Sequence, residues 1–141
     1  MFVVQDFVAQ HIDLEAPARG WRRSATVVRG RVRSPERRPL VVILRKEPVE
    51  RAWVAAGRPP PSGPYPDGEG KGTIVPPWEI EWQPTSRSFE LILPLDRSSS
   101  PGRYYGVIYV ATEVVVDRAI SRRSVYSEDG WPGGAFVIDL F

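Results

Sequence analysis

Residues that could carry out chemistry are few in this chain and lie far apart. His11 is the single histidine, cysteine is absent, and no serine stands in the G-x-S-x-G pattern of a nucleophile elbow. A zinc site built from histidine and cysteine is therefore excluded. The glycine-rich stretch from Gly68 to Gly72 lacks the spacing of a phosphate-binding loop. We expect no catalytic residue, no metal site and no cofactor, which leaves recognition as the chemistry to explain.

Arginine is the residue type with the most suggestive spacing. It recurs at alternate positions in one predicted strand, where neighbours on the same face stand about 6.8 Å apart. That distance resembles the phosphate spacing of a single nucleic-acid strand, so the pattern predicts a polyanion-binding face. The predicted set is Arg29, Arg31, Arg33, Arg37 and Arg38. The alternative is a solvated sheet face on which arginines pair with acids of neighbouring strands, namely Glu79, Glu81 and Glu90.

Aromatic residues form a second group with a potential for binding. The chain has five tryptophans and five tyrosines, more than one sandwich core requires. Exposed tryptophan and tyrosine side chains are favoured anchors at protein interfaces. The predicted partner-binding residues are Trp53, Tyr65, Tyr105 and Tyr109. The alternative is ordinary core packing, which the alternation of Trp78 and Trp82 favours at those two positions.

Charge is distributed unevenly along the chain. Residues 1–46 carry ten basic and four acidic side chains, whereas residues 47–141 carry nine basic and thirteen acidic ones. The two halves therefore have net charges of +6 and −4. Such an asymmetry favours either pairing within one fold or docking between oppositely charged subunits.

Two predicted strands that follow each other in the chain form the framework that positions the arginines and aromatic residues. From Ser88 to Leu95, apolar residues alternate with others, as in a strand with one buried face. A turn containing Pro101 and Gly102 follows, and then an apolar, aromatic run to Val116 that is typical of a central strand. On this strand Tyr104 and alternate residues should face the core, with Tyr105 facing the other way.

The join between those strands resembles the tyrosine corner of immunoglobulin-like and fibronectin type III-like sandwiches. The residues that carry it are Pro101-Gly102-Arg103-Tyr104. The resemblance implies a Greek-key fold in which the Tyr104 hydroxyl bonds to backbone just upstream. Gly106 stands where antibody domains have their second core cysteine, and the resemblance implies no activity.

The remaining chain predicts further strands and one long connection. Gly57 to Pro77 contains seven prolines and five glycines and is expected to be a loop. No convincing amphipathic helix is found. The expected further strands are Met1–Val8, Ser24–Arg33, Leu40–Leu44, Val49–Ala56, Trp78–Trp82, Ala119–Tyr126 and Ala135–Phe141.

The sequence thus predicts one all-β domain over residues 1–141, a single antiparallel, immunoglobulin-like β-sandwich with a long Pro/Gly-rich loop. No signal peptide or membrane span is expected, and the lack of cysteine suits a cytoplasmic setting. The predicted function is a non-catalytic binding or structural subunit of a larger protein assembly, with other subunits or copies of itself as partners. It would dock through loops, sheet edges and exposed aromatics. The alternative is a nucleic-acid or other polyanion binder that uses the arginine-rich face.

Overall fold

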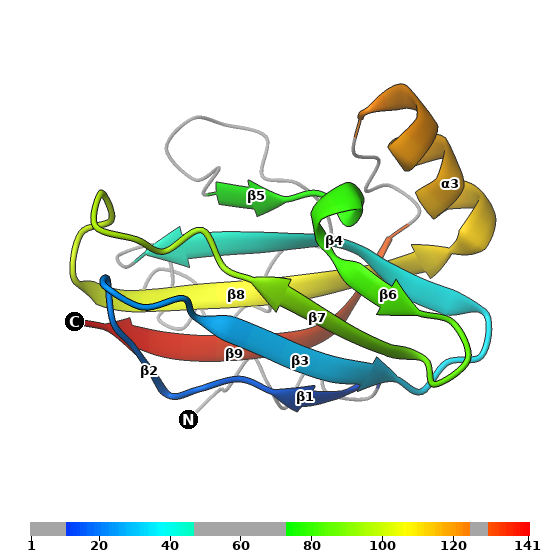
Figure 1. Ribbon diagram of the computed structural model, residues 1–141. Coiled ribbons are helices and arrows are strands. Elements are labelled where there is room, and N and C mark those ends of the chain that lie inside the picture. Colours follow the sequence, from blue (N-terminus) through cyan, green and yellow to red (C-terminus); the bar gives the residue numbers. More distant parts are fainter. Residues whose placement is uncertain (1–10, 47–72, 125–129) are drawn as a thin grey trace, which may run out of the picture.

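Two β-sheets form the framework of the protein in the computed structural model, which describes residues 11–46, 73–124 and 130–141 (Figure 1). The four-stranded sheet has the order β1-β3-β7-β6, and the five-stranded sheet has the order β2-β9-β8-β4-β5. The first sheet consists of β1 (Ile12–Glu15), β3 (Val27–Val32), β7 (Ser88–Ile92) and β6 (Glu81–Gln83). The second consists of β2 (Arg19–Gly20), β9 (Trp131–Leu140), β8 (Gly102–Thr112), β4 (Arg37–Lys46) and β5 (Thr73–Val75). The predicted all-β character is confirmed.

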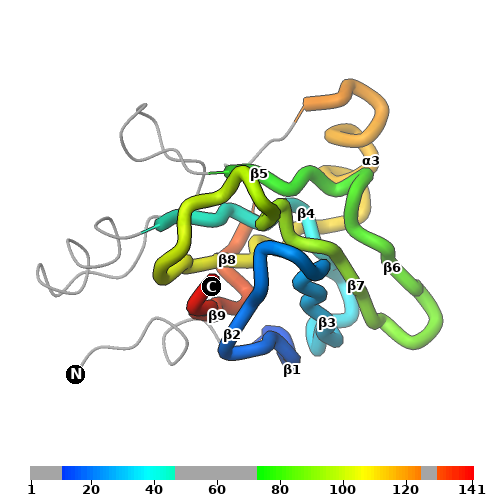
Figure 2. The backbone as a smooth tube through the Cα atoms, turned by 60° about the vertical axis from the view of Figure 1, so that its left-hand side comes forward, coloured from blue at the N-terminus to red at the C-terminus, as the bar shows by residue number. Residues whose placement is uncertain are grey.

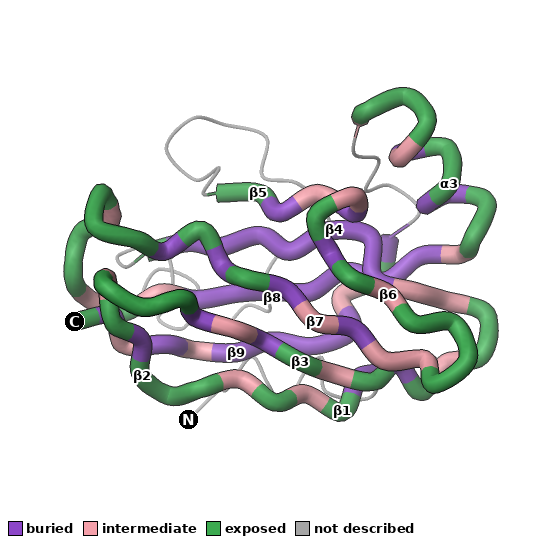
Figure 3. The backbone as a smooth tube through the Cα atoms, in the orientation of Figure 1, coloured by how far each residue is buried: buried purple, intermediate pink, exposed green. Residues whose placement is uncertain are grey.

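The main core lies between the two sheets, which stack as layers in Figures 1 and 2. Alternation places Val28 and Val32 of β3 on the inner face, while the arginines between them point outward. The opposite layer contributes Ile108 and Val110 from β8, together with residues of β4 and β9. Figure 3 shows the result as buried residues along the central strands and exposed residues at the edges. The prediction that the arginines of this strand lie on a face directed away from the core is confirmed.

The predicted tyrosine corner is present at the start of β8. The Tyr104 hydroxyl donates a hydrogen bond to the Ser100 carbonyl, four residues upstream, over 2.8 Å. The ring is half-buried rather than fully buried and packs at the edge of the main core. Burial raises the pKa of Tyr104 above its ordinary value.

A second core covers the outer face of the five-stranded sheet. Tyr105, Val107 and Tyr109 of β8 point to this side, as the alternation predicts, and pack with Leu40 and Val41 of β4. The helix α3 (Glu113–Arg122) lies over part of this face and contributes further apolar side chains. β8 is therefore buried on both of its faces.

The α3 helix corrects three sequence predictions. The chain was expected to stay extended to Val116 and again from Ala119 to Tyr126, and no amphipathic helix was expected. The burial of Val115, Val116 and Ala119 fits one face of a helix, whereas Val114 stays exposed. β-branched valines favour strands as isolated residues. Packing against β4 and β8 overrides that preference here. Arg123 ends the helix in a left-handed conformation.

Several other boundaries differ from the predictions. β4 extends over ten residues instead of the five from Leu40 to Leu44, with a register shift after Pro39. The expected strand from Trp78 to Trp82 divides into a 3-10 turn, η1 (Pro77–Glu79), and the short β6. Of the expected loop 57–77, residues 73–75 form β5 and Pro77 begins η1. The rest of that loop, and the expected strands Met1–Val8 and Val49–Ala56, lie outside the described residues.

The segment before β3 also differs, and this difference positions the site described below. None of the predicted strands falls between residues 11 and 20, but this segment contains β1 and β2. β2 pairs in parallel with the end of β9, where Arg19 stands opposite Asp139 and Gly20 opposite Leu140. The sandwich is therefore not purely antiparallel, and the residues after Gly20 lie beside the end of β9.

Candidate anion-binding site

The aromatic residues predicted to bind a partner do not form an exposed set in the described structure. Tyr105 and Tyr109 are almost completely buried in the second core, which corrects the expectation that they are exposed. Their side of β8 is covered by apolar side chains that include those of α3. Trp53 and Tyr65 lie outside the described residues. The large exposed aromatic rings in the described part are instead Trp21, Trp131 and Phe141.

The arginine row on β3 faces solvent as predicted, but acids of the neighbouring strands pair with it. Arg29 Nε donates to a Glu90 carboxylate oxygen on β7 over 2.7 Å. Arg33 donates to the Asp13 carboxylate on β1, and this hydrogen bond lowers the pKa of Asp13 below its ordinary value. Arg31 stands between the same two strands, opposite Asp13 on one side. This face is a ladder of mixed charge, in which Glu90 pairs as the ion-pairing alternative expected, while the second acid is Asp13 rather than Glu79 or Glu81.

The other two arginines of the predicted polyanion set lie against tryptophan rings. The Arg37 guanidinium carbon stands 3.2 Å from the ring centroid of Trp131. Arg38 lies 5.6 Å from the ring of Trp82 and also reaches a Glu113 carboxylate oxygen at 3.5 Å. Both guanidinium groups are therefore committed to contacts within the domain.

A different group of residues comes together where β2 and β9 end. The Arg22 amide donates to the Phe141 carbonyl over 3.1 Å, and the Phe141 amide donates to the Gly20 carbonyl over 2.9 Å. These two backbone bonds hold Trp21 beside Phe141, with ring centroids 5.1 Å apart and planes tilted by 31°. Trp21 is 53% exposed and Phe141 is 51% exposed. Two large apolar rings thus stand together in solvent.

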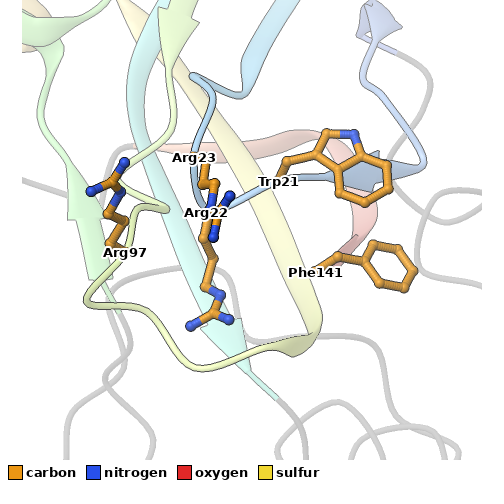
Figure 4. A pocket seen from close by; sticks show the side chains of 5 residues that line it. All are labelled: Trp21, Arg22, Arg23, Arg97 and Phe141. Carbon is orange, nitrogen blue, oxygen red and sulfur yellow. The ribbon is translucent and has the colours of Figure 1, made fainter.

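Three arginines border this ring pair. Arg22 and Arg23 lie in the turn that the Ser24 amide closes by donating to the Trp21 carbonyl over 3.0 Å. Arg97 comes from the connection between β7 and β8. Together with Trp21 and Phe141 they line a hollow of about 620 Å³. In the view of Figure 4 the rings stand on one side of this hollow and the arginines on the other. We call these five residues the Trp21 site.

The arginines of the Trp21 site differ from Arg29 and Arg33, which each form an ion pair with an acid of a neighbouring strand. Within residues 11–46, 73–124 and 130–141, no carboxylate forms an ion pair with Arg22, Arg23 or Arg97. Arg22 Nε is shielded from solvent and has no hydrogen-bond partner among those residues. Their charge is therefore left uncompensated by direct contact.

The carboxylate of Asp96 borders the arginines, and its hydrogen bonds are made elsewhere. Asp96 lines a neighbouring depression together with Arg22 and Arg97. Its Oδ1 accepts from the Ser98 hydroxyl over 2.5 Å and from the Ser98 amide over 2.8 Å. These bonds lower the pKa of Asp96, so its carboxylate stays ionised. Its negative charge weakens the positive potential of the site, but it forms no ion pair with Arg22 or Arg97.

The Trp21 site was not predicted from the sequence. The adjacent Trp21-Arg22-Arg23 was the available signal. Arg97 and Phe141 are remote in sequence, and only the parallel pairing of β2 with β9 brings Phe141 to this end. A strand of two residues is too short to show a sequence pattern that would predict this pairing.

Comparisons with protein-family models, with curated proteins and with solved structures found no match to this chain. No helix within the described residues has the length and apolar character needed to cross a membrane. Over the same residues, no three histidine or acidic side chains gather closely enough to hold a metal ion. Function is therefore inferred from the geometry of the Trp21 site.

Proposed function

We propose that this chain is a non-catalytic, immunoglobulin-like binding domain that recognises an anionic partner through the Trp21 site. The strand orders β1-β3-β7-β6 and β2-β9-β8-β4-β5 support the immunoglobulin-like type. They match the A-B-E-D and A′-G-F-C-C′ orders of that fold when the strands are lettered along the chain. The tyrosine corner at Tyr104 is a second mark of the same fold.

The observation that carries the proposal is the contrast between two sets of arginines. Arg29 and Arg33 meet acids of adjacent strands, while Arg22, Arg23 and Arg97 surround a hollow without an ion-pair partner in the described structure. Like charges that converge on one hollow repel each other unless an anion joins them. Guanidinium groups offer paired N–H donors that fit carboxylates and phosphates.

The exposed ring pair supports binding as the role of this end of the domain. Tryptophan and arginine are the residues most enriched at energetically important interface positions. In an assembly, the acidic surface of another subunit would supply the negative charge, and Trp21 and Phe141 would be buried in the contact. The acidic second half of this chain offers such charge, so a copy of the same domain is one source.

The proposal is tested by retention on heparin, a polyanion that is neither a protein nor a nucleic acid and so does not favour either kind of partner. Arg22→Gln/Arg23→Gln/Arg97→Gln should elute at markedly lower salt than the parent chain. The matched control is Arg29→Gln/Arg31→Gln/Arg33→Gln, which removes the same charge from the ladder on β3. We expect the control to elute close to the parent, and thermal melting should show that both variants are folded. Equal losses in the two variants would mean that net charge, rather than the Trp21 site, governs binding.

A further inference from the structure

The Trp21 site combines a charged surface and a flat apolar surface, and one class of ligand has groups that fit both. Its arginines offer charged donors, and its rings offer flat apolar faces, on opposite sides of the hollow in Figure 4. We infer that the ligand is single-stranded nucleic acid, with phosphates among the arginines and bases on Trp21 and Phe141. This inference rests on the proposed anion recognition and names its partner.

The ring geometry favours a stacking role. The indole of Trp21 and the ring of Phe141 have centroids 5.1 Å apart and planes tilted by 31°, and about half of each residue remains exposed. Every nucleic-acid base has a π-face that stacks on such rings without regard to sequence. A base placed there removes apolar surface from water on both partners.

The side of the site next to Phe141 adds a further cation. The Arg19 guanidinium carbon stands 5.9 Å from the centroid of the Phe141 ring. Arg19 also lies opposite Asp139 in the β2–β9 pairing, and Asp139 accepts from Arg103 over 3.0 Å. Arg19 is thus a further cation beside the ring pair, and proteins that bind single strands combine basic side chains with aromatic platforms.

Double-stranded nucleic acid fits this site less well. Its bases are stacked inside the duplex, so only phosphates would meet the domain and the rings would stay in water. Reading a major groove requires an inserted helix or β-ribbon. α3, the helix within the described residues, lies at the other end of the sandwich from the Trp21 site (Figure 1).

The acidic side chains of a protein surface would pair with the arginines but would not themselves cover the rings. Aspartate and glutamate present carboxylates without flat faces, so their contacts leave Trp21 and Phe141 to be covered by unrelated apolar residues. Bases and phosphates, by contrast, alternate in a single strand. The pairing of rings with arginines therefore favours nucleic acid over an acidic peptide.

The test measures binding of a labelled oligothymidylate and of an abasic strand with the same number of phosphates. We expect the oligothymidylate to bind on the order of tenfold more tightly, since stacking on an aromatic ring strengthens binding by that order. Three phosphate contacts predict a slope of about −2 for log affinity against log salt. Trp21→Ala/Phe141→Ala should abolish the preference for bases while leaving heparin retention intact, and Trp21→Phe should keep it.

Trp131→Ala is the matched control, because Trp131 is 48% exposed and also touches an arginine, but lies at the start of β9, at the opposite end. It should bind both strands as the parent does. Equal binding of the abasic strand and the oligothymidylate, or tighter binding of polyglutamate, would overturn the inference and leave the proposed anion recognition standing. If the parent chain itself is not retained on heparin, both the proposed anion recognition and the inference of nucleic-acid binding are overturned.

Discussion

The ring of Phe136 on β9 lies over Gly106 on β8, its directly opposite partner. A Cβ built on Gly106 would overlap three carbons of that ring. The same arrangement recurs in the other sheet, where the ring of Phe89 covers Gly30, the residue opposite it. In each layer the space that a side chain would fill is filled by a phenylalanine from the next strand.

The first prediction concerns this packing. Gly106→Ala should destabilise the domain by about 1–3 kcal/mol, because the Phe136 ring has to move within a filled core. Chemical denaturation measures the loss. Phe136→Leu combined with Gly106→Ala should recover part of it, and a single Gly106→Ala variant as stable as the parent would contradict the packing described here.

The second prediction separates the α3 helix from the strand expected at the same residues. In a strand Val114 and Val116 would share a face, but in α3 Val114 is 66% exposed and Val116 is fully buried. Val116→Ala should cost about 1–2 kcal/mol, and Val114→Ala should cost almost nothing. Thermal melting of the two variants compares an identical change at both positions. Similar losses would favour the strand.

The third prediction uses the tyrosine corner. Tyr104→Phe removes the hydrogen bond to Ser100 and should cost about 0.5–1 kcal/mol near neutral pH. Since folding raises the pKa of Tyr104 above 10.0, its contribution is present below that pH and disappears as pH rises through the folded value. The difference in unfolding free energy between parent and variant should therefore shrink in alkali. A difference that is constant across this range would exclude the corner as its source.

The fourth prediction concerns the charge ladder on β3. Arg33→Gln should return the pKa of Asp13 toward its ordinary value, because the hydrogen bond from Arg33 is the main cause of its lowering. The stabilisation from this pair is present above the ordinary carboxyl pKa and is lost as pH falls through the lowered one. Carboxyl-carbon NMR titration measures the shift. The pKa of Asp96 is lowered by hydrogen bonds from Ser98 instead, so it should not change in this variant and serves as the internal reference.

Local patterns in the sequence were sufficient for the central strands. The alternation around Tyr104 assigned both faces of β8 correctly, and Pro101-Gly102 marked the turn that precedes it. These features depend on residues close together in the chain. The burial of Tyr105 could not be predicted in the same way, because the apolar residues that cover its side of β8 belong to β4 and α3.

The Trp21 site depended on contacts that no local pattern encodes. Its rings meet because two-residue β2 joins the end of β9 in parallel, and its arginines stand out only once the partners of Arg29 and Arg33 are known. The sequence shows every arginine alike. Only the register of neighbouring strands distinguishes those that meet acids from those left to bind.

The most direct test of the central claim is a ¹H–¹⁵N NMR titration of the parent chain with a short heparin fragment. The account predicts that the shifts concentrate on the Trp21 indole N–H, on the backbone amides of residues 21–24 and on the Nε–H groups of Arg22 and Arg97. The signals of Arg29, Arg31 and Arg33 should stay in place. Shifts that follow β3 and leave Trp21 unchanged, or no saturable shifts at all, would contradict it.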